Sequence, residues 1–211
     1  MKRIFDVLLA FIGLLGTLPL FAVIAICIKV DSEGPVFYRG VRAGLSGKPF
    51  RMFKFRTMVM NADRIGGPSS AANDPRITRV GRFLRRYKLD ELPQLVNVLN
   101  GDMSFVGPRP EVLEYVAMFN AEEQAILSVP PGITDWSSIW NRHEGAILAR
   151  SSDPERTYLE QIRPQKIRLQ LEYVRNRSFS TDLRILLETI RVLLLKARAP
   201  EIDTENRGAQ S

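Results

Sequence analysis

The sequence predicts an α+β protein that is mainly α-helical, with a small β-hairpin, an N-terminal membrane helix and amphipathic helices at the membrane surface. Three observations support this prediction. Val7 to Ile28 contains no charged residue, two short aromatic-rich runs flank a glycine-rich loop, and apolar residues recur at helical spacing from Asp74 to Lys88. A chain of 211 residues can bury a sizeable core within one domain.

Composition limits the chemistry that the chain can perform. It has one histidine, His143, and one cysteine, Cys27, so histidine triads, zinc clusters and disulfides have almost nothing to be built from. Carboxylates, cations and a hard metal ion remain. The net charge of +7 indicates anionic partners, and nucleic acid, anionic lipid and phosphorylated substrates all fit that charge.

Residues 1–30 are expected to form a membrane-anchoring helix, because the uncharged run spans about 33 Å at helical rise. A cleaved secretory signal is the competing interpretation, but no small-x-small cleavage site follows the run. Asp6, near the membrane surface, is expected to pair with Lys2 or Arg3.

The path of this helix through the bilayer depends on two features. Basic residues flank both of its ends, which places both ends in the cytoplasm by the positive-inside rule. Pro19 removes a backbone hydrogen bond near the middle and is the expected break in the helix. The residues alone leave two possibilities equally open: a bent helix that enters and leaves one leaflet, and a kinked single-pass anchor.

A β-hairpin is expected after the membrane helix, from the alternating runs Val36–Arg39 and Pro49–Phe55. Lys54 and Arg56 alternate with phenylalanines and therefore share one face of the second strand, either a solvated face or a binding face. Residues Asn61 to Asn73 show little periodicity and are expected to form a mobile loop or lid.

Two helices are expected next. In the first, from Asp74 to Lys88, arginines occupy the faces that the apolar residues leave, so it can lie on anionic lipid. The second is expected from about Leu89 to Leu99, with Pro93 in its first turn and Gly101 just past its end.

The adjacent acids Asp90 and Glu91 fall at the N-terminus of that second helix. Acidic residues are common there because they complement the helix dipole, and position alone favours capping over catalysis. The free amides of the same helix end would also favour a phosphate beside the acids.

Arg109 lies in a stiff turn, Gly107-Pro108-Arg109-Pro110-Glu111, in which prolines on both sides fix the backbone. A rigidly held arginine suits bidentate recognition of a phosphate, although a structural turn is the ordinary explanation. Trp136, Trp140 and Arg142 follow, and the tryptophans fit interfacial anchors or core positions.

The C-terminal part carries less information. Pro154 to Arg177 has a charged helical pattern, and the apolar run Leu183 to Leu195 is too short to span a bilayer comfortably, so it packs on the core or lies at the membrane surface. We expect residues 31–198 to form one cytoplasmic domain and residues 199–211 to be a disordered polar tail.

Taken together, these motifs resemble the bacterial sugar transferase family, monotopic phosphoglycosyl transferases that move a phosphosugar from a nucleotide diphosphate sugar to polyprenyl phosphate. The resemblance covers roughly the first 145 residues, in the family's order. It rests on Lys2-Arg3-x-x-Asp6, Lys54-Phe55-Arg56-Thr57-Met58, Asp74-Pro75-Arg76-Ile77-Thr78, Leu89-Asp90-Glu91-Leu92-Pro93-Gln94, Gly101-Asp102-Met103-Ser104, Gly107-Pro108-Arg109-Pro110 and Pro131-Gly132-Ile133-Thr134. It implies the minimal catalytic form of the family, with a re-entrant (bent) membrane helix broken at Pro19.

The resemblance also implies roles for particular residues. Asp90 would be the nucleophile that forms an aspartyl-phosphosugar and releases UMP. Glu91 would either help Asp90 hold Mg²⁺ or deprotonate the polyprenyl phosphate. The implied phosphate-binding residues are Lys54, Arg56, Arg109 and Arg142. The implied setting is the bacterial inner (cytoplasmic) membrane, with the lipid bilayer, a UDP-sugar donor and an undecaprenyl phosphate acceptor as partners and the site facing the cytoplasm.

The sequence departs from the family after Thr134, where Asp135 stands in place of the usual glycine. This leaves the sugar, the nucleotide base and the role of Arg142 open. The glycan pathway (exopolysaccharide, O-antigen, capsule or glycoprotein) and a homodimer also remain open. Two alternative functions are a noncatalytic membrane scaffold and a membrane-tethered nucleic-acid binder; the resemblance implies no nucleic acid.

Overall fold

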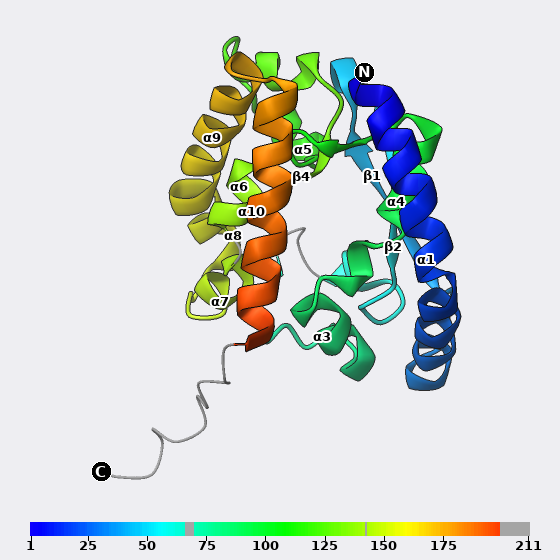
Figure 1. Ribbon diagram of the computed structural model, residues 1–211. Coiled ribbons are helices and arrows are strands. Elements are labelled where there is room, and N and C mark those ends of the chain that lie inside the picture. Colours follow the sequence, from blue (N-terminus) through cyan, green and yellow to red (C-terminus); the bar gives the residue numbers. More distant parts are fainter. Residues whose placement is uncertain (66–69, 142, 199–211) are drawn as a thin grey trace.

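The computed structural model describes residues 1–65, 70–141 and 143–198 (Figure 1). Its α-helices are α1 (Lys2–Asp31), α2 (Ala62–Ile65), α3 (Arg79–Arg86), α4 (Gln94–Asn100), α5 (Leu113–Val116), α6 (Trp136–Trp140), α7 (Glu144–Leu148), α8 (Pro154–Thr157), α9 (Arg163–Arg175) and α10 (Phe179–Arg198). Its strands are β1 (Phe37–Ala43), β2 (Pro49–Phe55), β3 (Ser104–Val106) and β4 (Gly132–Thr134). Four short helical segments complete it: η1 (Leu45–Gly47), η2 (Leu89–Glu91), η3 (Glu123–Ser128) and the π-helical η4 (Tyr158–Ile162). The predicted class, mainly helical with small sheets, is confirmed.

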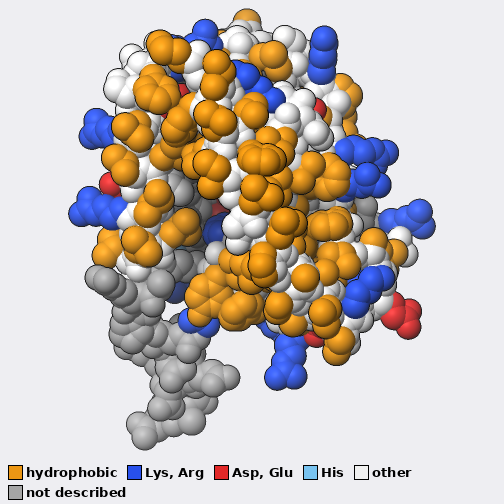
Figure 2. Space-filling model, turned by 45° about the vertical axis from the view of Figure 1, so that its right-hand side comes forward, with side chains coloured by type: hydrophobic (Ala, Val, Ile, Leu, Met, Phe, Trp, Pro, Cys, Tyr) orange, Lys and Arg blue, Asp and Glu red, His pale blue; other side chains and the backbone are white. Residues whose placement is uncertain are grey.

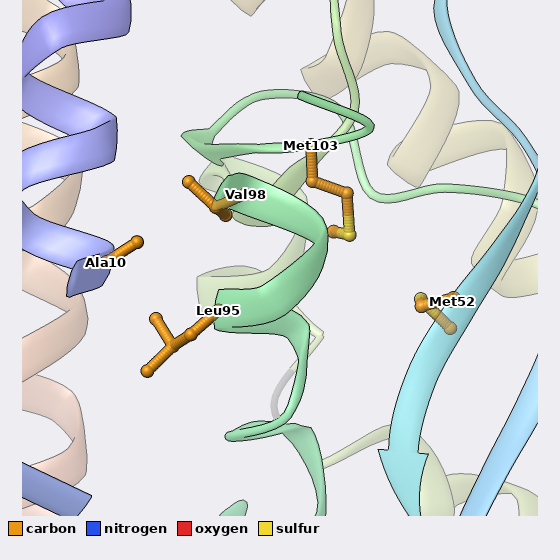
Figure 3. Packing of buried hydrophobic residues seen from close by; sticks show 5 residues of the cluster. All are labelled: Ala10, Met52, Leu95, Val98 and Met103. Atoms are coloured by element: carbon orange, nitrogen blue, oxygen red, sulfur yellow. The ribbon is translucent and has the colours of Figure 1, made fainter. Parts of the chain in front are cut away.

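Helix α1 runs down one side of the molecule, and α9 and α10 form the opposite side (Figure 1). It continues as one helix past Pro19, so the break expected at that residue is not found, since a proline removes one backbone hydrogen bond and the helix keeps the others. Ala10 of α1 is fully buried and faces α4, where Figure 3 shows Leu95 and Val98 pointing toward it. A second buried cluster joins the far end of α1 to the hairpin and α3 through Ile24, Ile28, Phe55 and Leu84. The rest of the described chain therefore packs against α1 toward each of its two ends.

Polar contacts fix both ends of α1 to the same body. At the N-terminal end, Lys2 forms an ion pair with Asp182 of α10, and Arg3 donates hydrogen bonds to carbonyl oxygens at the end of α4. At the other end, the Asp31 carboxylate accepts a hydrogen bond of 2.9 Å from the backbone amide of Val80 in α3. Both termini of the apolar helix thus contact the domain that follows it.

The expected pairing of Asp6 with Lys2 or Arg3 is wrong. Asp6 is buried, and its carboxylate accepts hydrogen bonds from Ser104 Oγ at 2.8 Å and from the backbone amide of Phe105 at 3.3 Å. The side chains of Lys2 and Arg3 contact α10 and α4 instead of Asp6. Tertiary contacts therefore replace the local i,i+3 and i,i+4 pairing.

The predicted hairpin is confirmed, with a first strand that extends to Ala43. Strands β1 and β2 pair antiparallel from Phe37↔Phe55 to Ala43↔Pro49, and η1 forms the connection. Ser46 and Gly47 there have positive φ angles of 55° and 73°, the conformation that reverses the chain in so short a loop. Phe55 is buried between the hairpin and α1.

The two helices expected between Asp74 and Leu99 begin later than predicted. Helix α3 begins at Arg79, because the Thr78 side chain accepts a hydrogen bond from the Gly81 amide and caps it there. Lys88, with φ of 57°, then breaks the helical path. The short turn η2 and helix α4 follow, and Gly101 ends α4 with φ of 92°, as expected.

A parallel pair of short strands, β3 and β4, was not predicted. Gly107, just after β3, and Gly132 in β4 let these two backbone segments approach closely. A Cβ on Gly132 would lie 2.1 Å from the Gly107 nitrogen. Helix α10 packs on this pair through Ile185 and is longer than the predicted run from Leu183 to Leu195. The predicted tail, residues 199–211, lies outside the described residues, as does part of the predicted loop at residues 66–69.

Helix α1 is the one described helix long and apolar enough to cross a membrane by length and composition. In its most apolar window only 11% of the residues are buried inside the protein. Exposed apolar side chains also follow α10, and the two helices touch through the rings of Phe5 and Phe179, 5.4 Å apart. Figure 2 shows hydrophobic side chains gathered across one face of the molecule. Such an area of exposed apolar surface is typical of a protein that meets a membrane or a partner.

Candidate active site

The predicted nucleophile, Asp90, lies in η2 between α3 and α4. Its side chain is 6% exposed, and its Oδ1 atom is buried without a hydrogen-bond partner among the described residues. A buried carboxylate oxygen normally has a partner, because leaving it unpaired costs about 1–3 kcal/mol. With that oxygen unpaired and shielded from solvent, the neighbouring cations are what offset the charge of the carboxylate.

Glu91 lies beside it and is held by two cations. Arg109 donates to both Glu91 oxygens, from Nη1 to Oε2 at 3.1 Å and from Nη2 to Oε1. Lys54 Nζ contacts Oε1 at 3.1 Å. The structure thus brings together four predicted site residues from the hairpin, η2 and the proline-flanked turn: Asp90, Glu91, Lys54 and Arg109.

The two acids have different electrostatic environments. Burial raises the pKa of the Asp90 carboxyl, and the neighbouring Glu91 carboxylate acts in the same direction. Burial also acts to raise the pKa of Glu91, but Arg109 and Lys54 outweigh it and hold that pKa well below its usual value. Contact with Glu91 in turn raises the pKa of Arg109. Glu91 is therefore a permanently charged anchor for two cations.

These residues line a cleft of about 1390 Å³ between the hairpin, α3, η2 and α10. Its walls carry both charged groups and apolar side chains such as Phe105, Ile139 and Leu193. A cleft of this mixed character can hold a ligand that has an anionic centre and apolar parts.

Arg85 is a site residue that the sequence reasoning missed. It projects from α3 into the cleft, where it donates from Nε to Thr57 Oγ1 at 2.8 Å and from Nη1 to Ser70 Oγ at 2.9 Å. Burial lowers the pKa of Arg85, and the nearby Asp90 carboxylate acts in the opposite direction. In the sequence it is one of several arginines on a basic helix, and only its spacing of five residues before Asp90 could have distinguished it.

Arg56 takes a different position from Lys54. Its buried guanidinium donates to the carbonyl oxygens of Ser32, Glu33 and Pro35, with distances of 2.6–2.9 Å. These contacts close the chain reversal after α1, and phosphate binding by Arg56 stays a prediction. Arg142 lies outside the described residues.

The turn that carries Arg109 is braced by Asp135. This carboxylate is fully buried and accepts hydrogen bonds from Ser137 Oγ and from the amide and hydroxyl of Ser138, at 2.6–2.8 Å. Its Oδ2 also faces the Arg109 backbone amide and Gln170 Nε2, each at 3.4 Å. Asp135 thus links the start of α6 to the turn that presents Arg109.

We expect Asp135→Asn to lower kcat/KM about tenfold without unfolding the protein. An asparagine keeps the shape but replaces one acceptor oxygen by an NH₂ group, which would face other donors around the Arg109 turn. The measurement is release of UMP, the activity that the sequence resemblance implies, at varied UDP-sugar, with circular dichroism to confirm folding. Asp153→Asn, at an exposed cap where asparagine serves equally well, is the matched control. Equal activity of the two variants would show that Asp135 does not position Arg109.

Mg²⁺ prefers oxygen ligands and often takes few of them from protein. The described residues contain no group of three or more histidine, cysteine, aspartate or glutamate side chains that could hold a metal by themselves. The Asp90 carboxylate lines the cleft, and the Glu91 carboxylate stands next to it. This donor set fits a Mg²⁺ ion that takes its other ligands from phosphates and water.

Comparison with known proteins gives a consistent set of relatives. The sequence profile described as bacterial sugar transferase matches residues 1–196. The UDP-glucose:undecaprenyl-phosphate glucose-1-phosphate transferase of Xanthomonas campestris pv. campestris is 42% identical, over 91% of this chain and 38% of the relative. The UDP-N-acetylgalactosamine-undecaprenyl-phosphate N-acetylgalactosaminephosphotransferase of Aeromonas hydrophila is 36% identical, over 92% of this chain and 43% of the relative. The uncharacterized sugar transferase EpsL of Bacillus subtilis (strain 168) is 39% identical, over 92% of this chain and 88% of the relative. The chain therefore spans about two fifths of the length of the first two relatives and most of the third.

Proposed function

The chain belongs to the bacterial sugar transferase family, and from this premise we propose that it transfers a phosphosugar from a UDP-sugar to undecaprenyl phosphate. The products are undecaprenyl-diphosphate-sugar and UMP, and the reaction is the first membrane step in the assembly of a glycoconjugate. The names of the relatives support this acceptor and this class of donor. Since those names include two different sugars, they leave the sugar open.

The observation that carries this proposal is the Asp90 carboxylate, which lines the cleft beside a glutamate that holds two cations. A nucleophile for a diphosphate must be an available anion in surroundings that offset its repulsion from the substrate. Asp90 supplies the anion. Lys54, Lys88 and Arg85 supply positive charge near it, and Arg109 does so at the neighbouring Glu91.

The reaction then proceeds in two displacements. A carboxylate oxygen of Asp90 attacks the phosphorus that bears the sugar, the bond from that phosphorus to the bridging oxygen breaks, and UMP leaves with that oxygen. The resulting aspartyl-phosphosugar is attacked by an oxygen of undecaprenyl phosphate. The acyl phosphate bond breaks, Asp90 returns to its carboxylate form, and the diphosphate product is released.

Glu91 acts in this scheme by positioning its cations and helping to bind the metal. Its lowered pKa makes it a weak base. A phosphate monoester also loses its second proton with a pKa of about 6, so near neutral pH much of the acceptor needs no base. The contacts therefore favour the anchoring role over deprotonation, the alternative that the sequence left open.

Mg²⁺ completes the proposed site. When bound to Asp90 and Glu91 it would supply positive charge against the donor's phosphates. The remaining charge compensation comes from the protein's own residues, with Arg109 held in a fixed orientation by Glu91 and Asp135.

We further propose that α1 lies in one leaflet of the bacterial cytoplasmic membrane as a re-entrant element, with the active site facing the cytoplasm. The support is that Lys2 and Asp31, at its two ends, contact the same domain. A helix that crossed the bilayer with its ends on opposite sides would carry that domain into the lipid with it. The exposed apolar side chains of α1 meet the acyl chains, and the acceptor's phosphate stays at the depth of the cleft.

The test is release of UMP by detergent-solubilised full-length protein from a panel of UDP-sugars, with Mg²⁺ and undecaprenyl phosphate. We expect release with one donor or a few related donors, accompanied by formation of a lipid-linked sugar. A folded protein that releases UMP from none of a broad panel would contradict the proposal.

A further inference from the structure

One face of the hairpin carries an arginine and a tyrosine that the catalytic scheme does not use. Tyr38 and Arg42 lie four residues apart in β1, so their side chains point to the same side of the strand. Tyr38 pairs across the hairpin with Lys54, whose ammonium contacts Glu91. Residues paired across an antiparallel ladder share a face. The face that brings Lys54 to the active site thus also carries Tyr38 and Arg42, and both line the cleft.

The two side chains meet over Gly40, which lies between them in the strand. A Cβ on Gly40 would lie 2.8 Å from Tyr38 Cε1 and 3.1 Å from Arg42 Nη1. The Tyr38 hydroxyl is 3.0 Å from the same point, so the hydroxyl and the guanidinium nitrogen are at most about 6 Å apart. We call this arrangement the Tyr38/Arg42 shelf. The absence of a side chain on Gly40 is what allows it to form.

Arg42 keeps unused hydrogen-bonding capacity toward the cleft. It is partly buried, its Nη1 donates at 2.8 Å to the carbonyl oxygen of the adjacent Val41, and no acidic side chain in the described part of the chain forms an ion pair with it. The nearby Glu111 already pairs with Lys166. Burial lowers the pKa of Arg42, a sign that its charge is partly desolvated without full compensation. Lys54 and Arg109, in contrast, are both engaged by Glu91.

The shelf lies at a definite offset from the catalytic centre. A strand rises about 3.3 Å per residue, so Gly40 lies about 7 Å along β1 from the Tyr38–Lys54 pair. This offset is longer than the distance between the two phosphorus atoms of a diphosphate. It is similar to the distance from a phosphorus atom to the base of the same nucleotide.

We propose that the Tyr38/Arg42 shelf binds the nucleobase of the donor, and that it selects uracil. This rests on the proposed function and names the part of the donor that this end of the cleft takes. The base stacks on the Tyr38 ring, and the Arg42 guanidinium donates to a carbonyl oxygen of the base. Arginine has donors and no acceptor, so it suits uracil, which offers carbonyl oxygens, better than the amino edge of cytosine. Stacking on an aromatic ring supplies affinity for any flat base.

The test is direct binding of UMP, CMP and ribose 5-phosphate to the detergent-solubilised full-length protein, by isothermal titration calorimetry. We expect Arg42→Ala and Tyr38→Leu each to weaken UMP binding about tenfold or more, and Arg42→Ala to reduce the preference for UMP over CMP. Ribose 5-phosphate keeps the phosphate and lacks the base, so its binding should change less than twofold. Gly40→Ala should weaken UMP binding as well, because its new methyl group displaces both side chains.

Arg39→Ala is the matched control. Arg39 lies in the same strand on the opposite face, over the ring of Phe53 at 5.6 Å, and its removal changes the net charge by the same amount. We expect wild-type affinity for UMP in that variant.

Two results would overturn the proposal. One is unchanged UMP affinity in folded Arg42→Ala and Tyr38→Leu proteins. The other is an equal loss of affinity for ribose 5-phosphate, which would make Arg42 a phosphate ligand. UMP binding that depends on the shelf, in a protein that releases UMP from no UDP-sugar, would support the shelf and contradict the transferase alone.

Discussion

Replacement of Asp90 by asparagine is expected to lower the rate of UMP release at least about thousandfold, to near the background of the assay. An amide of the same shape fits the buried position between α3 and α4, but it cannot attack phosphorus to give an acyl phosphate. The measurement is initial UMP release by wild type and variant at saturating UDP-sugar, undecaprenyl phosphate and Mg²⁺. Asp153→Asn, an exposed helix cap outside the cleft, is the control for loss of one carboxylate.

Wild-type rates of UMP release by the Asp90→Asn protein would show that Asp90 is not the nucleophile. They would also favour the alternative in which this domain is a noncatalytic scaffold, since a scaffold needs no nucleophile. Because asparagine preserves the volume of the side chain, we expect similar melting temperatures for the two proteins, so that a loss of rate reports on chemistry.

On the proposed mechanism, the Asp90 carboxylate also sets how activity responds to acid. Its pKa is raised by burial and by Glu91, and the reaction needs the ionised form. Activity should therefore fall on acidification at a higher pH than the ordinary aspartate pKa of about 3.9 would give. Glu91 has a lowered pKa and stays charged throughout this range. A kcat/KM that falls only below the ordinary aspartate pKa of about 3.9, in a protein that stays folded there, would contradict this assignment.

Arg109→Lys should lower kcat/KM about a hundredfold, the second largest effect that we expect. Arg109 contacts both oxygens of Glu91 with a planar guanidinium, which fixes the direction of its remaining donors. Lysine keeps the charge but contacts the carboxylate at a single point, so both the cation and Glu91 lose their orientation.

Arg175→Lys provides the control for Arg109→Lys, because Arg175 forms an exposed ion pair with Glu122 at the far end of α9. Exposed pairs of this kind contribute little to stability. UMP release should therefore be unaffected in that variant. If Arg109→Lys retained more than half of the wild-type kcat/KM, the bidentate contact would have no catalytic importance.

Local sequence patterns predicted the elements whose signals are short-range. The hairpin followed from alternation around glycines, and the end of α4 followed from Gly101, whose φ is 92°. The start of α3 was placed too early, because helical spacing of apolar residues continues from Ile77 while the cap is set by Thr78. Side-chain capping outweighed periodicity there.

Long-range pairings could not be predicted in the same way. Strands β3 and β4 have three residues each and are separated by more than twenty residues, so neither has a usable alternation pattern. Asp6 likewise finds its partners in Ser104 and Phe105, far along the chain. These contacts form only when α1 packs on the folded domain.

The candidate site was predictable in part. Asp90, Glu91, Lys54 and Arg109 came from motifs, and the structure brings their side chains to one cleft. Arg85 was hidden among the arginines of its helix, and the Tyr38/Arg42 shelf depends on side chains that lean together over Gly40. Which cation faces the cleft, and which is held by a carboxylate, is decided by tertiary packing.

The most direct measurement of the central claim is intact-protein and peptide mass spectrometry after incubation with UDP-sugar and Mg²⁺ in the absence of undecaprenyl phosphate. Asp90 as nucleophile predicts a protein heavier by one phosphosugar, with the added mass on the peptide that contains Asp90, and its loss when undecaprenyl phosphate is added. It predicts no such adduct in Asp90→Asn. An active protein that releases UMP only when acceptor is present, and never carries the phosphosugar, would show direct transfer and contradict the account.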